Sequence, residues 1–121
     1  MGHVNNANHL TYIEIARLKY FEHVLKTDGN WRKEGGLILA RVEIDYKKPI
    51  LLNDTVFVYT RCSKIGNKSL QLDWLIVNKK DETEEIMAQG LAVVVYFDYQ
   101  NNKTVSVPDT HKKMISLFEG I

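Results

Sequence analysis

The fold is decided by the stretch Gly2-His3-Val4-Asn5-Asn6-Ala7-Asn8-His9-Leu10-Thr11-Tyr12-Ile13-Glu14-Ile15-Ala16-Arg17, in which a polar turn runs straight into a patterned helix. Apolar side chains recur there in steps of three and four residues, which predicts one long helix. They are Leu10, Ile13, Ala16, Tyr20 and Val24, with Phe21 and Leu25 on the flank. Free backbone N–H groups at a helix start attract negative charge, so the junction is a natural place to hold an oxyanion or a phosphate.

The same pattern predicts how the helix is buried and where it ends. Tyr12 and Ile15 widen the apolar side, so we expect the helix to be buried over much of its surface. Asn6 or Asn8 can cap the start of the helix, and the Asp-Gly-Asn segment 28–30 supplies the stop. Residues 31–36 then form a loop.

From Leu37 onward the apolar pattern changes to a period of two, which is typical of strands. The expected strands are 37–46, 55–63, 70–77, 86–99 and 104–107, with a hairpin turn at 65–68, a charged loop at 79–85 and a terminal helix from 108 to about 119. The nearly all-apolar run 91–97 predicts a central strand, and Gly90 suggests a bulge or bend. One long helix followed by an antiparallel meander predicts a single α+β domain over residues 1–121, with the sheet curled around the helix.

The composition excludes several classes of protein. Sixteen basic and fifteen acidic residues give a net charge of +1, which does not favour nucleic acid or an anionic membrane as the main partner. No apolar run approaches the roughly 18 residues of a membrane span, and the start lacks a signal peptide, so we expect a cytoplasmic protein. Cys62 is the only cysteine, which excludes an internal disulfide, and we expect its thiol to be inert. The four histidines form no cluster with cysteine, so we expect no structural zinc site.

The opening turn and helix resemble those of the hot-dog-fold thioesterases, in particular the branch of 4-hydroxybenzoyl-CoA and long-chain acyl-CoA thioesterases. Gly-His-Val-Asn-Asn followed by Tyr-x-Glu-x-Ala-Arg is the most specific part of the resemblance. Weaker agreement comes from segments 42–49, 53–54, 66–69 and 88–90, so the resemblance spans essentially the whole chain. It implies a hot-dog domain, a homodimer or homotetramer, and hydrolysis of an acyl-CoA or acyl-carrier-protein thioester to the free acid. We expect no cofactor and no metal.

The sequence departs from the family pattern in one respect. Family members carry a strand and then an aspartate, the usual nucleophile or general base, just upstream of the opening turn, and here both would fall before Met1. A wrong start site at an internal methionine, a deliberately shortened chain and a true loss of catalysis each explain this, and we favour the first. The alternative function is therefore a non-catalytic acyl-thioester-binding protein. By resemblance, the strand would cover the sheet edge beside 55–63, and an uncovered edge favours association.

The resemblance assigns three candidate catalytic residues. The backbone N–H of Asn6 matches the oxyanion-hole position, although Asn6 can equally serve as a helix cap. His3 matches a histidine that related plant acyl-carrier-protein thioesterases use as a base, the alternative being an exposed loop histidine. Glu14 is a candidate because some hot-dog thioesterases place their catalytic glutamate on this helix. Its alternative is an ion pair with Arg17 three residues on.

The candidate substrate-binding residues are Val4, Asn5, Tyr12, Lys64, Lys68 and Ser69. Val4 and Asn5 belong to the opening turn, and Tyr12 could line an acyl channel or simply belong to the core. The other three flank a hairpin that lies near the CoA nucleotide by resemblance. Lysines can bind phosphates there as point charges, or they can be ordinary solvated charges.

Overall fold

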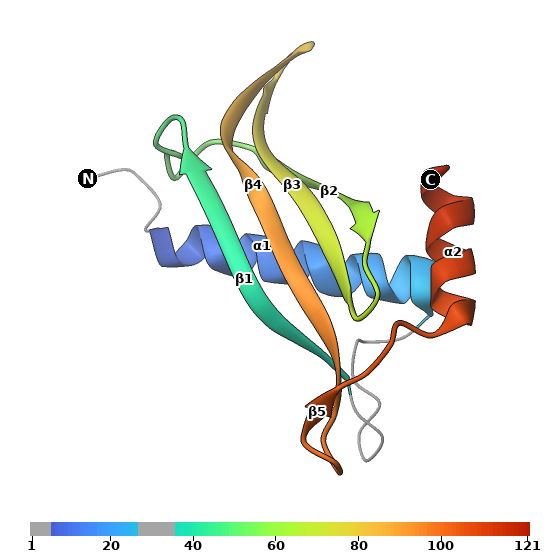
Figure 1. Ribbon diagram of the computed structural model, residues 1–121. Helices are drawn as coiled ribbons and strands as arrows, with labels where there is room; N and C mark the ends of the chain where they lie inside the picture. Colours follow the sequence, from blue (N-terminus) through green and yellow to red (C-terminus); the bar gives the residue numbers. More distant parts are fainter. Residues whose placement is uncertain (1–5, 27–35) are drawn as a thin grey trace.

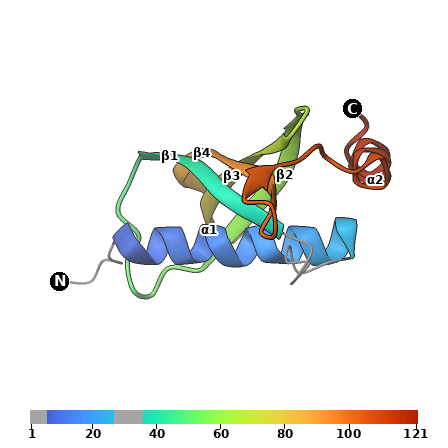
Figure 2. The same ribbon diagram turned by 60° about the horizontal axis from the view of Figure 1, so that its bottom comes forward.

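The computed structural model describes residues 6–26 and 36–121. Its helices and strands are α1 (Asn6–Tyr20), the π-helical turn η1 (Phe21–Leu25), β1 (Gly36–Tyr46), β2 (Val56–Ile65), β3 (Ser69–Lys80), β4 (Thr83–Asp98), β5 (Lys103–Thr104) and α2 (Asp109–Glu119). The strands form one antiparallel sheet in the order β1-β4-β3-β2, and β5 pairs with β4 outside this path. Helix α1 lies across one face of the sheet, and α2 lies beside the end of α1 (Figure 1, Figure 2). The predicted α+β architecture is confirmed.

Helix α1 is buried along one stripe only. Ile13 and Tyr20 face the sheet and are buried, whereas Leu10, Ile15 and Leu18 are exposed. The expectation of burial over much of the helix is therefore wrong. In the part of the chain that the structure describes, the sheet covers a single side of α1 (Figure 2).

The helical segment ends at Leu25, earlier than predicted. The widened turn η1 buries Phe21, Val24 and Leu25 together. Lys26 then adopts a left-handed conformation (φ 60°), with its N–H bonded to the carbonyl of Phe21. The predicted stop at 28–30 and most of the predicted loop 31–36 lie outside the described residues. Asn8 lies inside α1, so it cannot be the cap.

The inner strands of the sheet are β4 and β3. β4 pairs with β1 on one side and with β3 on the other, which confirms the central position predicted from the run 91–97. Both strands extend into the segment 79–85, which was predicted as a loop, and leave only Asp81-Glu82 as the turn. Opposite charges pair across the strands there: Lys79 Nζ lies 3.9 Å from Glu84 Oε1. At the other end, β5 is shorter than the predicted strand 104–107.

Gly90 marks a close approach rather than a bulge. The register runs regularly through the pairs Ile44–Gly90 and Gly90–Trp74, and the irregularities of β4 pairing lie elsewhere, at Leu39/Arg41 and Ile76/Val77. A Cβ at Gly90 would overlap the backbone oxygen of Glu43 and lie 2.7 Å from Cζ2 of Trp74. Of the two alternatives predicted for Gly90, a bulge or a bend, the bulge is therefore wrong, and glycine is needed because neighbouring atoms occupy the side-chain space.

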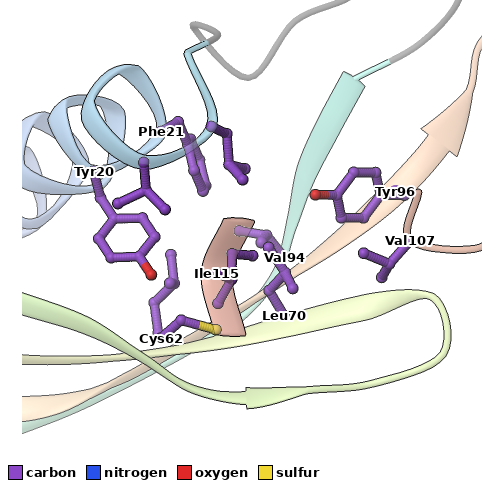
Figure 3. Close-up of a cluster of buried hydrophobic side chains, with 11 residues drawn as sticks. Tyr20, Phe21, Cys62, Leu70, Val94, Tyr96, Val107 and Ile115 are labelled. Atoms are coloured by element: carbon purple, nitrogen blue, oxygen red, sulfur yellow. The ribbon is translucent and has the colours of Figure 1, made fainter. Parts of the chain in front are cut away.

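The core divides into two clusters along α1. The first cluster, beside the start of α1, consists of Ile13, Ile50, Trp74, Ile76, Met87 and Ala88. The second cluster, beside η1, consists of Tyr20, Phe21, Val24, Leu25, Cys62, Leu70, Leu72, Val94, Tyr96, Val107 and Ile115. Figure 3 shows how the second cluster draws side chains from α1, the sheet and α2 into one buried group.

Candidate functional site

The start of α1 has the electrostatics of an anion-binding site. The helix begins at Asn6, and its first turn contains no acidic residue, while Arg17 and Lys19 occupy its last turn. The basic residues stabilise the negative end of the helix dipole, and no carboxylate of the first turn neutralises the positive end. The backbone N–H groups of the first turn are therefore suited to hold an oxyanion.

The start of α1 packs against the end of β1. His9 is 2% exposed, and its ring lies edge-on to the ring of Tyr46, with 5.1 Å between the centroids. On the helix itself, the ring of Tyr12 lies 6.5 Å from that of His9. After Tyr46, the N–H groups of Lys47 and Lys48 both donate to the carbonyl of Met87, at 2.9 and 3.0 Å. The end of β1 is thus fixed to β4 where it supports the helix.

Three of the predicted site residues, His3, Val4 and Asn5, lie outside the described residues. Asn6 is the first residue of α1. This position is the one that the proposed role of its N–H at the helix start requires. Glu14 is exposed on α1, eight residues further on and therefore about 12 Å along the helix axis. Burial lowers the pKa of Arg17, and the charge of Glu14 opposes this shift.

Tyr12 packs against the core and also lines a groove. Its half-buried side chain packs against the first cluster and also lines a groove of about 560 Å³ between α1 and β2. Ile15 and Ala16 of α1 and Val56 and Val58 of β2 continue the apolar lining. The groove therefore runs along α1 from Tyr12 toward Tyr20 and Phe118.

The residues Lys64, Lys68 and Ser69 lie at the other end of the molecule. Lys64 and Lys68 are exposed around the turn between β2 and β3, and Ser69 begins β3. The N–H of Tyr96 donates to the carbonyl of Lys68 at 3.0 Å, and Ile65 packs against the second cluster. Within one chain, this hairpin is therefore separated from Asn6 by about the length of α1, roughly 22 Å.

Cys62 is not a nucleophile. Its side chain is buried, and burial raises the pKa of the thiol to about 11. A thiol with that pKa carries almost no thiolate at neutral pH. The expectation of an inert cysteine is confirmed.

Two residues of α2, Glu119 and His111, anchor this helix through polar contacts, and sequence reasoning missed both. Glu119 Oε2 accepts hydrogen bonds from Tyr20 Oη at 2.7 Å and from the N–H of Cys62 at 2.6 Å. Tyr96 Oη lies 2.7 Å from Nδ1 of His111, and burial raises the pKa of Tyr96 and lowers that of His111. These contacts join α2 to Tyr20, Cys62 and Tyr96 of the second cluster, so they stabilise the end of α1 and not its start.

The described residues contain neither a metal-binding group nor a membrane-spanning helix. No three His, Cys, Asp or Glu side chains of residues 6–26 and 36–121 are placed to hold a metal ion. Within the same ranges, no helix is long and apolar enough to cross a membrane.

A family model described as the thioesterase-like superfamily matches residues 1–115. Two solved structures are similar over nearly the whole chain. One is a thioesterase from Thermus thermophilus, complexed with coenzyme A and Zn, which is 34% identical over 99% of this chain and 84% of that chain, with a TM-score of 0.81. The other is a putative thioesterase, the PA2801 protein of Pseudomonas aeruginosa, which is 28% identical over 94% and 85%, with a TM-score of 0.82. The long-chain acyl-CoA thioesterase FadM of Escherichia coli is 23% identical over 87% of this chain and 78% of that protein.

Proposed function

Because the chain belongs to the thioesterase-like superfamily of hot-dog proteins, as its sequence predicts, we propose that it hydrolyses acyl-CoA thioesters to the free acid and CoA. The superfamily fold and the thioesterases that share it support acyl-thioester hydrolysis in general. The observation that carries the proposal is the start of α1, where the first turn contains no carboxylate and His9 packs against Tyr46 at the end of β1.

In the proposed reaction, the thioester carbonyl lies at the start of α1. Water attacks the carbonyl carbon, the resulting oxyanion accepts a hydrogen bond from the N–H of Asn6, and the C–S bond then breaks. The water proton passes to a general base, and the CoA sulfur leaves as a thiolate or takes that proton. We assign the base to His3, which is close to Asn6 in sequence, since Glu14 lies about 12 Å away along the helix.

A second subunit gives a binding role to the hairpin residues Lys64, Lys68 and Ser69. Within one chain they lie near the opposite end of α1 from Asn6, roughly 22 Å away. In a homodimer or homotetramer, we propose that they contact the CoA phosphates of a substrate held at the partner's helix start. Val4, Asn5 and Tyr12 then contact the acyl end.

The test is release of CoA from a panel of aliphatic and aromatic acyl-CoAs. We expect turnover by the chain, a loss of about 100-fold in kcat for His3→Ala, and a change of less than about twofold for Glu14→Gln. Loss of kcat in Glu14→Gln but not in His3→Ala would transfer the base to Glu14. Binding of acyl-CoA without any CoA release would instead establish the non-catalytic binding protein.

A further inference from the structure

We propose that His9 is the positioning residue of this site: its ring, packed edge-on against Tyr46, fixes the first turn of α1 and with it the N–H of Asn6. The inference rests on the proposed function and deepens it. His9 does not touch the substrate in this role. It acts through the helix backbone, by holding the oxyanion-binding amide at one distance from the sheet.

The exposure of the neighbouring side chains indicates why His9, and not another of them, positions the helix start. Asn8, Leu10 and Thr11 are exposed, whereas His9 is 2% exposed. The next buried side chain along α1 is Ile13, one turn later. Between residues 8 and 26, His9 is thus the first buried side chain that ties α1 to the sheet.

The surface that His9 contacts is tied to the sheet and to the core. Tyr46 is the last residue of β1 and pairs with Ala88 of β4. The next two N–H groups, of Lys47 and Lys48, are both held by the carbonyl of Met87. The following segment is tied to the core by Ile50, which is 1% exposed in the first cluster. Tyr46 itself is 43% exposed, so it forms the rim on which the helix start rests.

The rate of thioester hydrolysis depends strongly on the position of the oxyanion-binding N–H. An oxyanion-hole donor works only at about 2.7–3.1 Å from the developing charge. A misplacement of about 1 Å in a catalytic site can cost roughly 100-fold in rate. An edge-on contact between two rings fixes distance and tilt together, which an aliphatic side chain of similar size does not do.

The experiment compares ring-keeping and ring-removing variants. His9→Phe and Tyr46→Phe keep both rings, whereas His9→Leu and Tyr46→Leu each remove one. Ile115→Ala, in the second cluster, is the matched control for a buried substitution away from the helix start. For each variant we would measure kcat, KM, and the hydrogen-exchange rates of the α1 amides.

We expect kcat to fall by about 10- to 100-fold in His9→Leu and Tyr46→Leu, with KM changed by less than about threefold. The two ring-keeping variants should retain kcat within about threefold. The first-turn amides of α1 should exchange at least about tenfold faster in the two leucine variants and at the wild-type rate in His9→Phe and in Ile115→Ala.

Equal kcat in His9→Leu and His9→Phe, or equal exchange rates in those two variants, would overturn the proposal. A parallel loss of kcat in folded Ile115→Ala would also overturn it, because the effect would then be general destabilisation. If the wild-type chain releases no CoA from any substrate, the proposed function fails. The exchange rates alone then decide whether His9 positions the helix start.

Discussion

The two ends of helix α1 are built differently. At its start, a single histidine ring and the first cluster hold the helix against the sheet. At its end, the larger second cluster surrounds η1, and α2 is anchored there by Glu119 and His111. The difference indicates that stability is concentrated at the end of the helix and the candidate chemistry at its start. Substitutions at the two ends should therefore have separable effects.

The largest effect on stability is expected from Ile115→Ala. Ile115 is fully buried in the second cluster, and removing its side chain leaves a cavity. We expect a loss of about 2–5 kcal/mol in the free energy of unfolding, measured by urea titration. At temperatures where the variant is folded, kcat should stay within about twofold of wild type. A large loss of kcat in the folded variant would contradict the claim that stability depends on the end of α1 and catalysis on its start.

Gly90→Ala should lower both the free energy of unfolding and kcat. The new methyl group would overlap the carbonyl of Glu43 and press on Trp74, which belongs to the first cluster. We expect a loss of about 1–3 kcal/mol in unfolding free energy, together with lower kcat. Trp74→Phe should not rescue Gly90→Ala, because the backbone oxygen of Glu43 stays in place. Full rescue would show that glycine is needed at position 90 only because of the Trp74 ring.

A smaller loss is expected when the anchor of α2 is removed. Glu119→Ala leaves the N–H of Cys62 and the hydroxyl of Tyr20 without their acceptor. Because the carboxylate is only partly buried, we expect a loss of about 1–2 kcal/mol, and less for Glu119→Gln, which keeps an acceptor oxygen. The rate at which a thiol reagent labels Cys62 should rise in the order wild type, Glu119→Gln, Glu119→Ala. Unchanged labelling in Glu119→Ala would show that Glu119 does not hold α2 in place.

The smallest effect is a dependence of stability on pH. Burial lowers the pKa of His111 from its ordinary value of 6.5, so below pH 6.5 the unfolded chain binds more protons than the folded chain. Stability should therefore be fully present above pH 6.5 and decline as the pH falls below it. Urea titrations at about pH 7.5 and about pH 5.5 should show this decline, and the decline should be smaller in His111→Gln. An equal decline in that variant would assign the effect to other groups.

The sequence predicted the elements better than the contacts between them. Periodicity located α1, the main strands and the central position of β4, because those patterns are local. The pairing of His9 with Tyr46 and of Glu119 with Cys62 joins residues far apart in the chain, and no local pattern carries such information. Gly90 is a further example. Its sequence context does not distinguish a glycine that leaves room for Glu43 and Trp74 from a glycine that bends a strand. Of the candidate site, the helix start was predictable because it is itself a local feature.

The most direct test of the central claim, that the start of α1 holds the thioester oxyanion, compares kcat in Asn6→Pro and Asn6→Ala. Proline removes the N–H of this position yet is tolerated in the first turn of a helix, whereas alanine keeps the N–H. We expect Asn6→Pro to lose about 100- to 1000-fold in kcat relative to Asn6→Ala, with similar unfolding free energies. Equal kcat in the two variants would contradict the claim.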